Sequence, residues 1–507
     1  MVNVLETYAI ELGNAKIDIN IISKEKGFTD SYFLNLPEFG KGTKALLDSI
    51  KKQLLASVEL NIDKATDPKK VEELKQIVRL RALAMLEKES KTSKQEDLNF
   101  LTEVLVNEMF GLGNIEFLLA DGNLEELVIN NATEAIHVYH KKYGWLSTNV
   151  FVKPEDDILN YANIIARKIG KQITVLDPLL DAHLLSGDRV NSTLFPISTK
   201  GNTITIRKFR RDPWTVTDLI SNKTVSSEVM ATIWEAIQYE MSVVFSGGTA
   251  SGKTTILGVS MPFIPPNHRI ISIEDTREIF LPEYLHWVPL TTREPNPEGK
   301  GEVTMLDLLV NSLRMRPDRI VVGEIRRKEE AEVLFEAMHT GHSAYTTVHA
   351  NTADETIRRL TNPPIEIPST MLDAVGLNIV MFRNRRLGVR RILQLSEYIT
   401  ERRGNEEAVK ANILYRWKAK EDSIEKYSES IRFYEELGLY TGLLPAEIND
   451  EILEKKMILE WMLNQSIHNI TDVGKVIAEY YSNSTVVLDA IRRNDKKMLL
   501  GEMKEAK

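Results

Sequence analysis

Short apolar runs alternate with helical patterns of hydrophobic residues between about residues 224 and 395. Four of these runs are rich in β-branched residues and stop at a polar residue or a glycine, as buried strands do. They cover residues 242–245, 269–273, 319–322 and 343–348. Strands that alternate with helices are typical of βαβ units, so this part of the chain predicts an α/β fold with a mostly parallel sheet.

Amphipathic periodicity dominates the rest of the chain. Apolar residues recur at three- and four-residue steps over about residues 43–89 and again over about residues 400–491, where Pro445 is placed to open a helix. Over residues 98–218 a helical pattern gives way to short alternating segments, which is typical of a compact α+β domain. We therefore expect a mainly helical N-terminal region (1–97), an α+β domain (98–220), an α/β core (221–399) and a helical C-terminal region (400–507).

The composition excludes several classes of protein. The 507 residues contain no cysteine, which excludes a disulfide-stapled scaffold, a thiolate metal site and a catalytic cysteine. A net charge of -9 argues against a surface that coats nucleic acid. Charged residues interrupt positions 1–20, and no apolar run reaches the roughly 18 residues of a membrane-spanning helix, so the chain is expected to be soluble and without a signal peptide.

The segment 247–254 carries the most specific chemical signal. It reads GGTASGKT, fits the pattern G-x-x-x-x-G-K-[ST], follows a predicted strand and leads into a helical pattern. The backbone N–H groups of such a loop cradle phosphates, its lysine reaches the β- and γ-phosphates, and the hydroxyl that follows binds Mg²⁺. We therefore expect a nucleotide, with Mg²⁺ on Thr254, to be bound by Gly247, Gly248, Thr249, Ala250, Ser251, Gly252, Lys253, Thr254 and Thr255.

Carboxylates follow two of the predicted strands. One apolar run ends in Glu274 and Asp275, and the next ends in Gly323 and Glu324. Ligand-binding groups gather at the carboxyl ends of parallel strands, so these positions suit a metal ligand and a water-activating base beside the phosphates. A glycine before Glu324 would let the chain come close to the nucleotide because it has no Cβ.

Three histidines, His339, His342 and His349, lie close together in the sequence. A zinc site is one interpretation, but zinc needs four defined ligands and the spacing supplies no fourth. The other interpretation is a helix, a strand over 343–348, and a second helix that a capping box opens at 352–355. His349 then lies at a third strand end, where its imidazole could donate a hydrogen bond to a γ-phosphate.

Four motifs, in this order along the chain, resemble the secretion ATPases of type II and type IV systems, the hexameric motors of pilus assembly, pilus retraction and protein secretion. They are GGTASGKTT, ISIEDTREI, LRMRPDRIVVGEIRRKEEA and TGHSAYTTVHANTADETIRRL, which in that family are the Walker A loop, the Asp box, the Walker B strand and the His box. The resemblance covers roughly residues 100–400. It implies a RecA-like P-loop core preceded by a PAS-like α+β domain.

The same resemblance implies roles in ATP hydrolysis for three residues of the core. Glu274 of the Asp box would be the catalytic base. Glu324 would be the Walker B carboxylate that supports Mg²⁺, and His349 would be the sensor of the His box. With Lys253 on the phosphates, these residues form the expected catalytic set of an ATPase.

Arginines are implied as a further part of the site. The segment GDRVNSTLFPISTKGNTITIRKF is similar to the domain that precedes the core in this family, whose arginines close over the nucleotide. Arg189 and Arg207 are the matching positions, and Arg210 is a further candidate. Arginine suits this role because its guanidinium presents several donors to a charged phosphate.

The resemblance also implies partners and a location. It implies ATP and Mg²⁺ as cofactors, a homo-hexamer, and a polytopic membrane platform protein that the motor reaches from the cytoplasm at the inner face of the cell membrane. Some bacterial members carry a four-cysteine zinc module, which this chain lacks. The stretches NNATEAIHVYHKKYGW and ILYRWKAKEDS look like the archaeal branch, which assembles pili, the archaellum and related filaments.

Two alternatives from other functional classes share the phosphate-binding loop. One is a nucleic-acid translocase or helicase with a RecA-like core, which the acidic balance and the lack of an aromatic and basic stripe argue against. The other is a nucleotide-gated scaffold that does not hydrolyse ATP. The presence of both Glu274 and Glu324 argues against the scaffold.

Overall fold

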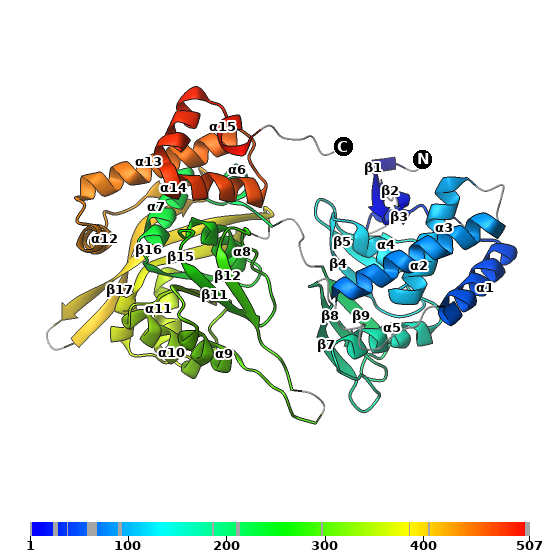
Figure 1. The fold of residues 1–507 in the computed structure, drawn as a ribbon. Coiled ribbons are helices and arrows are strands. Elements are labelled where there is room, and N and C mark those ends of the chain that lie inside the picture. Colours follow the sequence, from blue (N-terminus) through cyan, green and yellow to red (C-terminus); the bar gives the residue numbers. More distant parts are fainter. Residues whose placement is uncertain are drawn as a thin grey trace. The chain divides into compact units, whose positions relative to one another are not determined.

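The structure is a computed structural model that describes residues 3–23, 29–37, 39–57, 68–89, 94–184, 187–208, 213–295, 298–384, 386–403 and 406–501. The chain divides into two compact units, residues 1–211 and 212–507. Within the described residues, each unit is built around a nine-stranded sheet of its own. Figure 1 shows the two sheets with the helices around them.

The sheet of the first unit has the strand order β1-β2-β3-β6-β5-β4-β9-β8-β7, and its described pairs are antiparallel apart from β3 with β6. The strands are β1 (Asn3–Leu12), β2 (Ala15–Ser23), β3 (Ser31–Leu34), β4 (Leu124–Ile129), β5 (His137–His140), β6 (Gly144–Thr148), β7 (Leu179–His183), β8 (Arg189–Thr193) and β9 (Thr203–Arg207). The helices are α1 (Lys41–Ser57), α2 (Pro68–Glu89), α3 (Gln95–Phe110), α4 (Ile115–Ala120) and α5 (Glu155–Lys168).

Strands β1 to β3 lie where the sequence predicts a mainly helical region. In β2, the buried Ile17, Ile19 and Ile21 alternate with more exposed polar residues, which is the period of a half-buried strand. Because β3 pairs with β6, the N-terminal strands share one sheet and one buried core with the rest of the unit. The boundary expected at residue 97 therefore falls inside a folded unit, within α3, because strand pairing joins segments that are far apart in the sequence.

The sheet of the second unit has the order β12-β11-β13-β14-β10-β15-β16-β17-β18. The strands are β10 (Ser242–Gly247), β11 (Arg269–Glu274), β12 (His286–Thr291), β13 (Arg319–Val322), β14 (Ser343–Val348), β15 (Val375–Asn384), β16 (Val389–Arg403), β17 (Glu406–Lys418) and β18 (Ser423–Lys426). From β12 to β15 neighbouring strands are parallel, and from β15 to β18 they are antiparallel. The parallel sheet predicted from the four apolar runs is confirmed, because the runs are β10, β11, β13 and β14.

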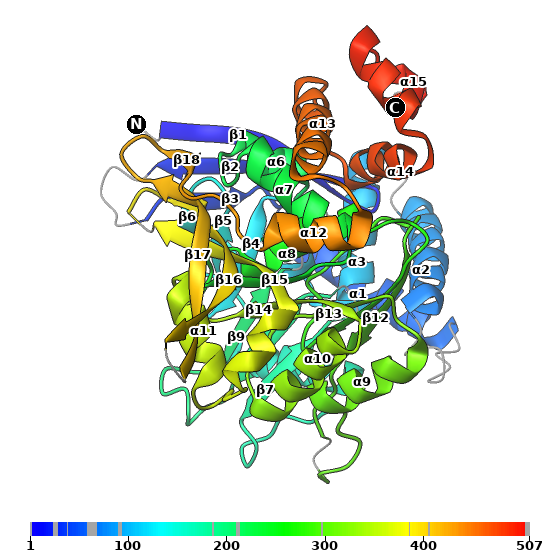
Figure 2. The same ribbon diagram turned by 90° about the vertical axis from the view of Figure 1, so that its left-hand side faces the viewer.

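Helices cover the second sheet and gather beyond one of its ends. They are α6 (Val216–Ser221), α7 (Ser227–Gln238), α8 (Lys253–Ser260), α9 (Met305–Ser312), α10 (Lys328–His339), α11 (Ala353–Thr361), α12 (Phe433–Thr441), α13 (Pro445–Asn464), α14 (Ile470–Arg493) and α15 (Lys497–Leu500). In both views α13 and α14 lie beside α6 and α7, and α13 packs on α7 (Figures 1 and 2).

The C-terminal region differs from the prediction of helices from about residue 400. There, β16 and β17 form a long antiparallel pair, which aligns Tyr398 with Ala411, and helices begin only at Phe433. Residues such as Ile399 and Tyr415 are β-branched or aromatic and favour strands. The spacing of apolar residues along the chain does not predict this hairpin, because the contacts that stabilise it are made between neighbouring strands and not along one face of a helix.

Candidate functional site

The phosphate-binding loop, residues 247–254, connects the central strand β10 to helix α8. Gly247 has a φ of 153°, and a Cβ there would come 2.6 Å from the carbonyl oxygen of Met381 on β15. Ala250 and Gly252 follow with φ values of 58° and 96°, so the loop passes twice through the left-handed region. Gly247 is therefore required by the close approach of β15, and Gly252 is required by the left-handed backbone of the turn.

Lys253 is the first residue of α8, and its side chain turns back over the loop. Its Nζ donates to the carbonyl oxygen of Gly248 at 3.1 Å, and only 8 % of the residue is exposed. Burial lowers the pKa of Lys253, and the carboxylate of Glu324 opposes that shift. The Ser251 hydroxyl is also buried and has no hydrogen-bond partner among the described residues. A buried ammonium, an unsatisfied hydroxyl and a helix N-terminus together fit a phosphate group.

Glu274 is the last residue of β11, and only 1 % of it is exposed. Its Oε1 accepts the backbone N–H groups of Glu278 at 2.9 Å and Ile279 at 3.1 Å. Its Oε2 is buried without a hydrogen-bond partner in the described part of the chain. Burial, opposed by the two hydrogen bonds, raises the pKa of Glu274 to about 7. A carboxyl group with that pKa exchanges its proton near neutral pH, and its ionised form can accept a proton from water.

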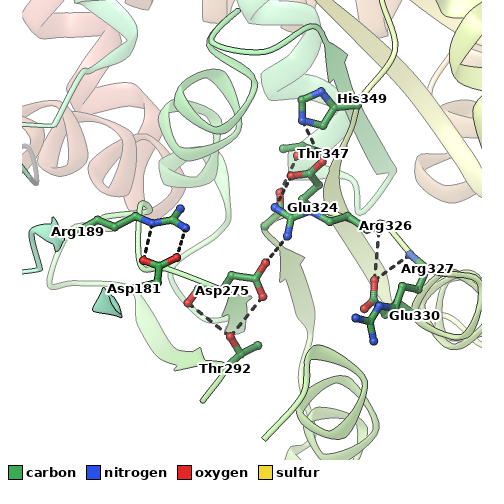
Figure 3. Close-up of polar contacts among 11 residues, drawn as sticks. Asp181, Arg189, Asp275, Thr292, Glu324, Arg326, Arg327, Glu330, Thr347 and His349 are labelled. Atoms are coloured by element: carbon green, nitrogen blue, oxygen red, sulfur yellow. Dashed lines mark hydrogen bonds and ion pairs between the residues drawn. The ribbon is translucent and has the colours of Figure 1, made fainter. Parts of the chain in front are cut away.

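Glu324 follows Gly323 at the carboxyl end of β13 and contacts two basic side chains (Figure 3). His349 Nε2 lies 3.1 Å from Glu324 Oε1, and one guanidinium nitrogen of Arg326 donates to Oε2 at 2.9 Å. The other terminal nitrogen of Arg326 donates to Asp275 at 2.8 Å. One guanidinium therefore bridges the carboxylates that follow β11 and β13.

His349 follows β14, and 41 % of its side chain is exposed. Burial lowers its pKa, the positive charge of Lys253 lowers it further, and Glu324 opposes both effects. On the same strand, the Thr347 hydroxyl donates to the carbonyl oxygen of Gly323 at 2.7 Å, which ties the end of β14 to the end of β13. A neutral imidazole has one N–H group, so His349 can donate either to Glu324 or to a phosphate oxygen, but not to both at once.

The strand order brings the predicted residues of the core to one edge of the sheet. Strands β11, β13, β14 and β10 are parallel neighbours, so Glu274, Glu324, His349 and the loop all lie at their carboxyl ends. Thr254 lies in the first turn of α8, as does Thr255. The Thr254 hydroxyl and the Glu324 carboxylate are the groups that could hold Mg²⁺ on a bound nucleotide.

The predicted arginines belong to the first unit. Arg189 on β8 and Arg207 on β9 are directly opposite each other in the sheet. Arg189 makes a two-point contact with Asp181 on β7, with distances of 2.8 and 3.3 Å (Figure 3). Arg210 lies outside the described residues. The two arginines are thus cross-strand neighbours, and acidic residues lie beside both of them: Asp181 contacts Arg189, and Glu126 on β4 is opposite Arg207.

Several residues beside the loop were not predicted from the sequence. Arg326 bridges two carboxylates, as described above. Asn351 places its Oδ1 2.9 Å from where a Cβ on Gly248 would lie, and Arg390 Nε donates to the carbonyl oxygen of Ala250 at 3.1 Å. The sequence offers a signal only for Arg326, which stands two residues after Glu324. The other contacts join segments about 100 to 140 residues apart.

The described residues contain neither a cluster of metal-ligating side chains nor a helix suited to a bilayer. No group of three or more His, Asp or Glu side chains there is arranged to hold a metal ion, so the zinc interpretation of His339, His342 and His349 finds no ligand set. None of the helices in the described ranges combines the length and the apolarity that crossing a bilayer requires.

Comparison with known proteins adds the family. A family model described as type II/IV secretion system protein matches residues 187–391, which include the loop and all three strand ends. The chain belongs to the type II and type IV secretion ATPase family. It is 36 % identical over 389 residues to the uncharacterized protein MJ0900 of Methanocaldococcus jannaschii, covering 75 % of this chain and 69 % of that protein. It is 29 % identical over 256 residues to the type IV secretion system protein PtlH of Bordetella pertussis, covering 46 % of this chain and 75 % of PtlH. The X-ray structure of the Legionella pneumophila ATPase DotB aligns with a TM-score of 0.40 and 19 % identity, over 75 % of this chain and 94 % of DotB.

Proposed function

We propose that the chain is an ATP-hydrolysing motor that works as a homo-hexamer. It powers the assembly of a type IV pilus-like filament, or secretion, through a polytopic membrane platform protein. The observation that carries this proposal is the convergence, at one sheet edge, of the phosphate-binding loop with Glu274 and Glu324. Membership of the secretion ATPase family supports the filament or secretion context.

In this proposal the residues divide the chemistry of hydrolysis among them. The loop N–H groups and Lys253 bind the phosphates, and Thr254 and Glu324 hold the metal. When bound, Mg²⁺ neutralises charge on the phosphoryl group that is transferred. Glu274 orients the attacking water and accepts its proton on Oε2, the buried oxygen for which the described residues supply no partner. His349 donates to the γ-phosphate and so distinguishes ATP from ADP.

Arg189 and Arg207 act in this proposal when the domain that carries them closes over the nucleotide. Arg189 would then exchange the carboxylate of Asp181 for phosphate oxygens, which offer the same two-point geometry. In this proposal the first unit, residues 1–211, contains the PAS-like domain that supplies these arginines, and the second unit, residues 212–507, contains the RecA-like core.

The proposed location is the cytoplasm, peripheral at the inner face of the cell membrane, where a motor can reach its platform protein. The stretches that look like the archaeal branch favour a filament of the archaeal pilus and archaellum class in this proposal. Nucleic acid is not proposed as a partner, because the chain is acidic overall.

The proposal is tested by measuring how fast the purified chain releases phosphate from ATP in the presence of Mg²⁺. We expect turnover by the wild type and loss of turnover, by at least a hundredfold, in Lys253→Ala and Glu274→Ala. Glu278→Ala is the matched control, because it removes an exposed carboxylate from the same turn and leaves its backbone N–H on Glu274. Unchanged rates in both site variants would contradict the mechanism.

Other outcomes separate the alternatives and test assembly. Many-fold stimulation by single-stranded DNA, with salt-sensitive binding, would favour a translocase. Tight ATP binding without repeated turnover would favour a scaffold. Light scattering with a non-hydrolysable ATP analogue tests the hexamer, and a monomer that persists in its presence would contradict it.

A further inference from the structure

Arg390, the second residue of β16, lies against the outer side of the phosphate-binding loop. Its Nε donates to the carbonyl oxygen of Ala250 at 3.1 Å. Its Cδ lies 3.5 Å from the position that a Cβ on Gly252 would take, so the aliphatic part of the side chain packs on the loop as well. Both contacts fall on the stretch of loop that precedes Lys253.

Ala250 is the residue of the loop whose conformation most needs support. Its φ of 58° lies in the left-handed region, which raises the conformational energy of an L-residue with a Cβ but not that of glycine. A hydrogen bond from a guanidinium to the carbonyl oxygen of that residue is charge-assisted and stabilises the conformation in which the oxygen points outward. The carbonyl group of Ala250 and the N–H group of Ser251 belong to one trans peptide unit and point in opposite directions. The hydrogen bond from Arg390 therefore also fixes the orientation of that N–H group, which donates to the carbonyl oxygen of Gly248 at 3.3 Å.

We propose that Arg390 is a positioning residue for nucleotide binding, which holds the loop in its phosphate-accepting conformation through the carbonyl oxygen of Ala250. This inference rests on the proposed function, because it assumes that the loop binds a nucleotide. It differs from a direct contact between Arg390 and a phosphate. The arginine acts on the side of the loop that carries the carbonyl oxygen, and the bound ligand meets the other side.

The predicted effect is on affinity rather than on chemistry. Such a loop cradles the α- and β-phosphates, which ATP and ADP share. Arg390→Ala should therefore weaken the binding of ADP and of a non-hydrolysable ATP analogue by the same factor, about threefold to tenfold, while kcat at saturating ATP stays within about twofold. Arg390→Lys should restore most of the affinity, because an ammonium can donate to the same oxygen.

Isothermal titration calorimetry of the full chain with Mg²⁺ and each nucleotide measures these affinities. Arg386→Ala is the matched control, because Arg386 is an exposed arginine in the turn of the same β-hairpin. The decisive measurement repeats Arg390→Ala in an Ala250→Gly background. Glycine adopts the left-handed conformation without support, so the loss should shrink to less than about twofold there.

The outcomes are distinct. If Arg390→Ala lowers nucleotide affinity by the same factor with and without the Ala250→Gly change, the inference is overturned in favour of a direct contact between Arg390 and a phosphate. If Arg390→Ala binds nucleotide as tightly as the Arg386→Ala control does, the inference is overturned altogether. It is also overturned if Arg390→Ala lowers the melting temperature of the protein and Arg390→Lys does not restore it. If the wild type itself binds no nucleotide, the proposed function fails. A wild type that binds and hydrolyses ATP beside an unaffected Arg390→Ala variant overturns this inference alone.

Discussion

Glu274 gives the protein a measurable link between its stability and pH. Burial raises the pKa of this carboxyl group from 4.5 to about 7, so the folded state holds the proton more tightly than the unfolded chain does. The stabilisation from this group is therefore complete below pH 4.5 and is lost as the pH rises through about 7. Glu274→Gln removes the titration and keeps an oxygen that can accept the same two backbone N–H groups.

The loss of folding free energy follows from the pKa shift of Glu274. A difference of about 2.5 pH units corresponds to about 3 kcal/mol of folding free energy, of which about 2 kcal/mol is lost between about pH 5.5 and pH 8.5. The free energy of unfolding of the wild type should fall by that amount relative to Glu274→Gln over this range. Any cost of burying the glutamine amide is the same at both pH values and cancels from the comparison.

Urea unfolding of the chain without nucleotide, followed by tryptophan fluorescence, measures this difference. Five of the six tryptophans lie in the second unit, so the signal reports mainly on the unit that contains Glu274. Glu283→Gln, a change of an exposed carboxylate whose charge does not contribute to the pKa shift of Glu274, is the control and should follow the wild type. The free energies of unfolding of the wild type and of Glu274→Gln could instead differ by the same amount at every pH in this range. Burial would then not destabilise the ionised carboxyl group, and the reasoning for its role as a base at neutral pH would be refuted.

Three further predictions concern the same unit. Gly247→Ala should lower nucleotide affinity by at least tenfold in calorimetry, because a Cβ there meets the Ser251 hydroxyl and the neighbouring strand; unchanged binding would contradict this close approach. Arg326→Ala should lower kcat more than it changes KM in a phosphate-release assay, since it disconnects two carboxylates that follow separate strands; a pure change in KM would contradict that role. Lys455→Met should destabilise the unit by about 3 to 5 kcal/mol in urea unfolding, because it leaves the fully buried Glu235 without its partner at 2.5 Å, and a second change of Glu235 to Leu should recover most of the loss. A double variant no more stable than the single one would count against this account.

The sequence by itself determined the local parts of this protein. The loop 247–254 needs a strand before it, glycines at its turn and a helix after it, and all of these are encoded within a short stretch. The residues that follow the apolar runs, among them Glu274 and Glu324, were predictable because parallel strands present their carboxyl ends at one edge. Each proposed site residue of the core therefore lies next to the local sequence pattern that forms its loop or strand.

Only the tertiary structure decided which distant segments support that edge. The contact of Arg390 with Ala250 and the bridge that Arg326 makes to Asp275 depend on strand order, which apolar periodicity does not encode. The strands in residues 389–426 were missed for the same reason, whereas the alternation of Ile17, Ile19 and Ile21 in β2 is a strand pattern that the sequence itself carries. A strand gains its backbone hydrogen bonds and its cross-strand side-chain contacts from a partner elsewhere in the chain, whereas a helix satisfies most of its backbone hydrogen bonds locally.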